Sequence, residues 1–175
     1  MRISVKGDSE GVRVRMRLEQ QRRWLATRIL LAILAIQGTV TGLWATVAPR
    51  SFYDDFPGFG MHWVSVDGPY NHHLAADVGA FFLALAAVTI AALYLDTGNA
   101  ARVTGLGWFV FALPHFIYHA THRPAEMTTG SFTISLISTM LLVLLGLACV
   151  IVPPRGAHLP DPNPIHLRFP RRRTR

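Results

Sequence analysis

Four long apolar stretches follow one another along this chain, separated by shorter polar segments. They cover residues 29–48, 72–95, 103–122 and 130–152, and among them only Asp77 carries a formal charge. A helix needs about 20 mostly apolar residues to cross the hydrocarbon core of a bilayer, and in lipid its backbone polar groups must be satisfied internally. The pattern therefore predicts an all-α fold, a four-helix transmembrane bundle.

The segment between the first two stretches, residues 49–71, is too long for a simple turn. It carries six aromatic residues, which are Phe52, Tyr53, Phe56, Phe59, Trp63 and Tyr70. The pairs Pro57-Gly58 and Gly68-Pro69 indicate turns inside it. Structureless loops of this length are uncommon in compact proteins, so we expect a long ordered outer loop that folds back over the mouth of the bundle. An ordered cap without chemistry is the other interpretation.

The composition agrees with a membrane protein of one domain. Hydrophobic residues make up 51% of the chain, charged residues 15%, and the mean hydropathy is +0.32. The net charge of +7 resides mainly at the two ends, outside the apolar stretches. This arrangement favours contact with anionic membrane lipids and gives no reason to expect a nucleic-acid partner. The single cysteine, Cys149, excludes an internal disulfide.

The distribution of Lys and Arg predicts the orientation. Residues 1–28 carry eight of them, residues 153–175 carry six, and Arg102 lies between the second and third stretches. Only Arg50 and Arg123 would lie on the opposite side. Because basic loops stay inside, both termini are expected in the cytoplasm of a cell whose plasma (inner) membrane the chain crosses several times.

The chain divides into three parts on this basis. Residues 1–23 form a basic cytoplasmic tail, residues 24–152 the transmembrane domain, and residues 153–175 a cytoplasmic tail rich in Pro and Arg. The tails are expected to lack regular structure, apart from an amphipathic stretch along the membrane near residues 12–24.

The histidines are the feature that most needs explanation. Six of the eight lie on the outer half, and these are His62, His72, His73, His115, His119 and His122. His73 and Asp77 are one helical turn apart, and so are His115 and His119. At about 1.5 Å per residue, Asp77 lies at the depth of the two histidines of the third stretch. An acid inside a membrane normally faces the bundle interior, so these groups are expected to meet in an outward-facing His/Asp-rich pocket.

Hydroxyl and amide groups occur at similar depth on the other two stretches. Ser131, Ser135, Ser138 and Thr139 lie on the fourth, and Thr41 and the deeper Gln37 lie on the first. They would complete a polar lining around the pocket.

The first hypothesis for this cluster is a transition-metal or haem site. Imidazole and carboxylate groups suit zinc, iron or copper, and His73, Asp77, His115 and His119 would be the ligands. A b-type haem held between His73 and His119 is a variant, because a four-helix bundle can enclose a porphyrin.

Two other hypotheses remain open. In one, the protein is a structural or accessory membrane subunit whose polar cluster only fixes helix packing, helped by the small residues Gly38 and Gly42. In the other, the protein is a membrane enzyme that acts on a lipid or isoprenoid, with Asp77 and His115 or His119 as an acid/base pair. No nucleophile or nucleotide-binding motif decides between them. Protein partners, including a second copy in a homo-oligomer, also remain open.

Two motifs resemble a known group. They are Gly68-Pro69-Tyr70-Asn71-His72-His73-Leu74, followed by Asp77 and Gly79, and Pro114-His115-Phe116-Ile117-Tyr118-His119. Together they resemble small four-helix membrane proteins encoded in actinobacterial genomes, a group of uncharacterised activity, over about residues 25–150. The four-helix layout is also similar to that of DoxX-like proteins, without matching motif residues. The resemblance implies a fold and a membrane location, but no activity.

Overall fold

The computed structural model describes residues 2–8, 11–17, 19–154 and 165–168. Its main elements are four long helices, α1 (Glu19–Val47), α3 (His72–Leu95), α4 (Gly98–Thr121) and α5 (Thr129–Ile151). All four are long and apolar enough to cross a membrane. The predicted all-α four-helix bundle is therefore confirmed, although α1 begins well before the expected residue 29.

Polar residues determine where three of these helices begin. Asn71, Thr97 and Thr128 precede α3, α4 and α5, and each side chain accepts a hydrogen bond from the backbone N–H three residues further on. Such caps satisfy one of the backbone N–H groups that a helix start leaves without a partner. These capping residues mark the points where the connecting segments end and the helices begin.

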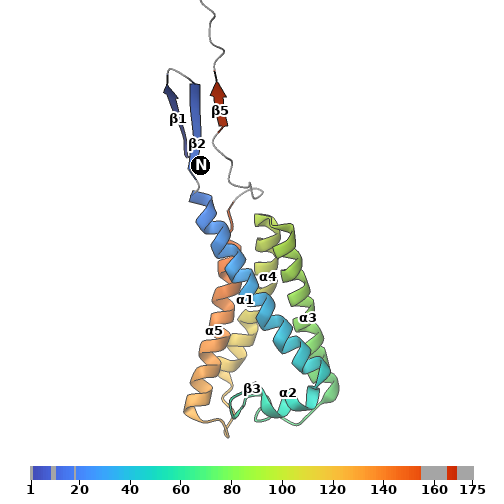
Figure 1. The fold of residues 1–175 in the computed structure, drawn as a ribbon. Helices are drawn as coiled ribbons and strands as arrows, with labels where there is room; N and C mark the ends of the chain where they lie inside the picture. The colour runs from blue at the N-terminus through green and yellow to red at the C-terminus, as the bar shows by residue number, and fades with distance from the viewer. Residues whose placement is uncertain (1, 9–10, 18, 155–164, 169–175) are drawn as a thin grey trace, which may run out of the picture.

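The helices form two close pairs, α1 with α3 and α4 with α5. A Cβ atom on Gly42 would lie 2.8 Å from the backbone nitrogen of Leu83 in α3, and one on Gly105 would lie 2.9 Å from the carbonyl oxygen of Gly146 in α5. Small residues therefore bring the backbones of each pair into contact, as expected of helix association in membranes. The pairs diverge toward the end where α2 and β3 lie (Figure 1).

Aromatic packing joins the two pairs away from that end. Trp108 of α4 is fully buried, and its indole N–H donates to the hydroxyl of Thr89 in α3 at 2.8 Å. Its ring packs against Phe82 of α3, with 6.2 Å between centroids, and against Phe111 of its own helix at 6.4 Å. The buried indole thus has both the apolar contacts and the hydrogen-bond acceptor that it requires.

Arginines connect the helix ends on the side opposite α2. Arg23 donates to the carbonyl oxygen of Val152 at 2.9 Å. Arg28 pairs with Asp96, which ends α3. Arg102 donates to the carbonyl oxygen of Pro153 beyond α5. Arg23 and Arg102 thus supply donors to carbonyl groups at the end of α5, which have no intrahelical partner.

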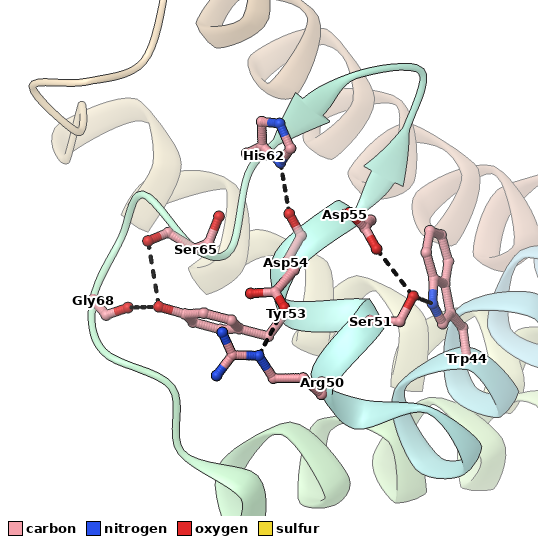
Figure 2. Close-up of polar contacts among 9 residues, drawn as sticks. All are labelled: Trp44, Arg50, Ser51, Tyr53, Asp54, Asp55, His62, Ser65 and Gly68. Atoms are coloured by element: carbon pink, nitrogen blue, oxygen red, sulfur yellow. Dashed lines mark hydrogen bonds and ion pairs between the residues drawn. The ribbon is translucent and has the colours of Figure 1, made fainter.

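The segment between α1 and α3 is ordered and compact, as predicted. It contains α2 (Pro49–Asp55) and a short hairpin of β3 (Pro57–Gly58) and β4 (Met61–His62). We call residues 48–71 the cap. The end of the bundle that the cap covers is called the capped end. Figure 2 shows the contacts of the cap. Tyr53 donates to the carbonyl oxygen of Gly68, and Arg50 pairs with Asp54 at 2.7 Å. Ser51 accepts a hydrogen bond from Trp44 of α1 and donates to Asp55.

The tails differ from the sequence-based expectation where the structure describes them. β1 (Arg2–Asp8) and β2 (Gly11–Arg17) form an antiparallel hairpin, and β5 (Ile165–Arg168) pairs with β2. These strands lie beyond the end of the bundle opposite the cap (Figure 1). The expected lack of regular structure is wrong for these residues, whereas residues 155–164 and 169–175 of the second tail lie outside the described residues. In the stretch expected to be amphipathic, near residues 12–24, β2 covers residues 12–17 and α1 begins at residue 19; its contact with the membrane stays a prediction. Apolar and basic residues alternate along β2, and this period of two is typical of a strand.

Candidate functional site

A cavity of about 430 Å³ lies at the capped end, where the two helix pairs diverge. The cap and all four long helices contribute to its wall. Its apolar lining includes Phe52, Phe56, Leu74, Val78, Phe82 and Leu142. Its polar lining includes Gln37, Thr41, Tyr53, Asp67, Asn71, His115, Tyr118, His119, Ser138 and Thr139. Cavities of this size, mostly apolar with a few polar groups, are typical of small-molecule sites.

Aromatic rings of the cap cover the cavity. Phe52 and Phe56 pack with their ring centroids 4.8 Å apart, and Phe56 contacts Trp63 at 5.9 Å. The indole N–H of Trp63 donates to the hydroxyl of Ser131 in α5 at 2.9 Å. The cap therefore reaches from α1 and α3, with which it is continuous, across to the second helix pair.

Two histidines of α4 form one side of the cavity. The ring of His115 stacks on that of Phe111 at 5.4 Å, and the ring of His119 meets it edge-on at 4.7 Å. The Nδ1 atom of His119 lies 3.2 Å from the hydroxyl of Ser135, which is fully buried in α5. The hydroxyl of Thr139 donates in turn to the carbonyl oxygen of Ser135 at 3.0 Å. The contact between His119 and Ser135 holds one ring nitrogen of His119 against α5.

A carboxylate reaches the same region from the cap. The hydroxyl of Tyr118 in α4 donates to Oδ2 of Asp67 at 3.0 Å. Tyr118 also contacts His119 edge-on, with 5.9 Å between ring centroids. The Asp67–Tyr118 pair is thus a second link between the cap and the second helix pair, next to the histidines.

The deep end of the cavity is formed by α1. The side-chain nitrogen of Gln37 donates to the hydroxyl of Thr41, one helical turn nearer the cap, at 3.3 Å. Both side chains line the cavity, and Phe82 and Leu142 line it as well. Gln37 and Thr41 therefore place one amide and one hydroxyl group beside the apolar side chains of Phe82 and Leu142.

The predicted meeting of Asp77 with the histidines of α4 does not occur. Asp77 pairs with His73 at 3.2 Å, but their side chains are 61% and 87% exposed, and neither belongs to the cavity lining. In the half of α3 nearer the cap, residues 75, 79 and 82 are buried, and Asp77 lies on the opposite side of the helix. The expected pocket combining Asp77 and His73 with His115 and His119 is therefore wrong in its geometry.

The proposed ligand set is consequently split into two pairs of residues. His73 and Asp77 lie on the outside of α3, whereas His115 and His119 line the cavity. Within the described ranges, no three His, Cys, Asp or Glu side chains are grouped so that they could hold a metal ion. A haem held between His73 and His119 has the same difficulty, because the two residues do not face one cavity.

The remaining three histidines of this half are exposed. His62 contacts the carbonyl oxygen of Asp54 at 2.6 Å, and His122 stacks on Tyr118 at 4.5 Å. His72 lies beside Tyr70 at the start of α3. The sequence pattern thus found the histidine-rich end of the molecule, but only two of these six residues belong to the cavity.

Sequence reasoning identified most of the polar lining and missed its acid. Ser138, Thr139, Thr41 and Gln37 line the cavity as expected. Asp67, in the cap, takes the place that Asp77 was expected to occupy. Its position beside the turn Gly68-Pro69, within a loop already expected to fold back, was the available signal.

Comparisons with family models, with curated proteins and with solved structures find no match to this chain. The functional argument therefore depends on the cavity itself. Its apolar volume, aromatic cover and few polar groups suit a molecule with a hydrocarbon body and a small hydrogen-bonding group.

Proposed function

We propose that this integral membrane protein binds an amphipathic, lipid-like small molecule in the cavity beneath the cap. The observation that carries the proposal is the cavity of about 430 Å³ between the diverging helix pairs, lined mainly by apolar and aromatic side chains. Burial of hydrocarbon there contributes about 25 cal/mol per Å² of apolar surface. The polar groups of α4 and Asp67 fix the orientation of the ligand head.

This proposal takes up one part of the lipid or isoprenoid hypothesis, namely recognition. The acid/base pair that the enzyme hypothesis required would include Asp77, which lies outside the cavity. Metal or haem binding stays a prediction, and its four suggested ligands are divided between the cavity and the outside of α3. The likeness to actinobacterial four-helix proteins likewise stays a prediction.

The proposal predicts that purified protein retains a lipid that depends on the cavity. Ala75 lines the cavity and is buried on α3, so Ala75→Phe should fill the site and abolish retention. Ala80 lies exposed on the same helix, and Ala80→Phe should retain as much lipid as the wild type. Extraction followed by mass spectrometry, at equal protein and detergent, measures the bound molecule.

A smaller change tests the same point where Ala75→Phe impairs folding. His119→Ala should weaken retention by about tenfold, equivalent to about 1.4 kcal/mol, through the loss of a polar contact. Asp77→Asn is its matched control and should change nothing, since Asp77 lies outside the cavity. Equal retention by wild type, His119→Ala and Ala75→Phe would contradict the proposal.

A further inference from the structure

An acid and an imidazole lie together on the outside of a membrane-spanning helix. Nε2 of His73 is 3.2 Å from Oδ2 of Asp77, and both side chains are largely exposed. Asp77 lies five residues, or about 7.5 Å, inside the span that begins at His72. A carboxylate that faces hydrocarbon is costly, and acids within spans normally face protein and find a partner there. The position of Asp77 therefore favours a protein surface as the neighbour of this side of α3.

The same side of α3 carries a regular repeat along most of its length. Six exposed residues are spaced alternately four and three positions apart, and these are His73, Asp77, Ala80, Ala84, Ala87 and Ala91. At about 100° per residue they lie within a strip about 80° wide. A mean spacing of 3.5 residues is typical of a helix that packs along another helix. We call these six residues the α3 seam.

The opposite side of α3 shows what this spacing does in the present molecule. Its buried residues also alternate by four and three positions, and these are Ala75, Gly79, Phe82, Ala86 and Thr89. They pack against neighbouring helices so closely that a Cβ atom on Gly79 would lie 2.7 Å from the backbone nitrogen of Thr46 in α1. The α3 seam has the same spacing, but within the part of the chain that the structure describes nothing covers it.

We propose that the α3 seam packs against the α3 seam of a second copy of this chain, which gives a parallel dimer with a two-fold axis along the membrane normal. Copies that insert with the same topology present their seams in the same direction and at the same depth. Under the two-fold axis the alanines of the two copies face each other, and their small side chains allow a close approach of the backbones.

The polar end of the seam determines that the occupant is a second copy. The seam carries both a donor, His73, and an acceptor, Asp77, one helical turn apart. In the two-fold arrangement the imidazole of each copy donates to the carboxylate of the other, so that two equivalent pairs form. The seam thus complements itself without a charged group from a different protein. It lies on the side of α3 away from the cavity, so the dimer is independent of ligand binding.

Cross-linking of the full-length protein in its membrane locates the contact. In a Cys149→Ala background, Ala91→Cys lies on the seam. Ile90→Cys is the matched control, because Ile90 is 52% exposed at nearly the same depth but about 100° around the helix. A disulfide requires Cα atoms within about 7 Å, so oxidation should link two copies about tenfold more efficiently through Ala91→Cys than through Ile90→Cys.

A bulky substitution on the seam should separate the copies. Ala84→Phe should raise the dissociation constant of the dimer about tenfold or more, since the added ring holds the two helices apart. Ile90→Phe is the control and should leave the dimer intact. Both parent residues are exposed in a single copy, so neither change fills the core. Native mass spectrometry in detergent measures the assembly against 19.4 kDa for one copy.

Exchange of the polar residues tests the pairing between copies. His73→Asp places acids at both positions of the seam, and Asp77→His places imidazoles at both. Each variant alone should form less dimer than the wild type, because like groups then face each other. Co-expression of the two variants with different tags should restore a mixed dimer, since every acid again meets an imidazole.

Several results would overturn the inference. Wild-type protein that is monomeric both in detergent and in bilayers would do so, and so would equal cross-linking through Ala91→Cys and Ile90→Cys. Cross-linking of the seam to a different protein would make that protein the occupant. Equal pairing by the single and the mixed exchange variants would contradict the contact between His73 and Asp77. Ala84→Phe should still retain lipid in the cavity, so loss of the dimer and failure of the proposed function are distinguishable.

Discussion

Gly105 and Gly107 of α4 differ in how closely a neighbouring helix approaches them. A Cβ atom on Gly105 would lie 2.6 Å from the Cβ atom of Cys149 in α5, which is closer than real Cβ atoms approach one another. A Cβ atom on Gly107 would meet only Leu85, at 3.8 Å, an ordinary contact distance. The close pairing of α4 with α5 therefore depends on single absent methyl groups.

We expect Gly105→Ala to destabilise the protein by about 1–3 kcal/mol, because the added methyl group must push α5 away. Gly107→Ala should be neutral or should stabilise by up to about 1 kcal/mol, because alanine favours the helix more than glycine does. Thermal unfolding in detergent, followed by circular dichroism, measures both. Equal midpoints for the two variants would show that the pair is looser than the structure indicates.

At the scale of elements, the cap is attached unequally to the two helix pairs. It is continuous in sequence with α1 and α3, but side-chain hydrogen bonds from Trp63 to Ser131 and from Tyr118 to Asp67 connect it to α5 and α4. Each such bond contributes about 0.5–1.5 kcal/mol. Loss of these two hydrogen bonds is therefore expected to loosen the cap on the side of α4 and α5.

The double variant Trp63→Phe with Tyr118→Phe removes both hydrogen bonds and keeps an aromatic ring at each position, although the phenyl group at residue 63 is smaller than the indole. We expect the backbone amides of residues 49–71 to exchange with deuterium about tenfold faster, while the helices exchange at the wild-type rate. Tyr94→Phe is the control, because Tyr94 is 89% exposed at the far end of α3. An unchanged cap in the double variant would show that ring packing alone closes the cavity.

At the scale of the whole molecule, charge differs between the two ends. Arg22, Arg23 and Arg28 of α1 and Arg102 of α4 lie toward the end opposite the cap, whereas Asp54, Asp55, Asp67 and Glu126 lie at the capped end. The preference of basic residues for the cytoplasmic side favours a cap that faces outward.

Labelling with a membrane-impermeant thiol reagent measures this orientation in intact cells. In a Cys149→Ala background, Glu126→Cys beyond α4 should react from outside, and Asn99→Cys near the start of α4 should react only after permeabilisation. Both parent residues are exposed. Reaction of both from the same side would contradict the four-span topology, and the reverse pattern would contradict the orientation alone.

The four spans could be predicted from the sequence alone because membrane insertion depends on the length and hydrophobicity of each segment, and both are read directly from the sequence. A span of about 20 apolar residues is required by the thickness of the bilayer. The helix at residues 72–95 could therefore be predicted without reference to the neighbouring helices, and the structure has a helix over the same range. The ordered loop also followed from local features, its aromatic residues and turn pairs. His115 and His119 line the cavity at the capped end.

The direction in which each residue faces was decided only by the tertiary structure. α3 is apolar on almost every side, so its sequence hardly distinguishes an inward face from an outward one. Ala75 and Gly79 are buried because small residues allow the close approach of α1. Asp77 lies about 200° around the helix from each of them, on the outside. The position of a residue along its helix follows from the sequence. The direction in which its side chain faces depends on how the helix packs against its neighbours. For this reason Asp77 faces outward, and the acid that lines the cavity is Asp67.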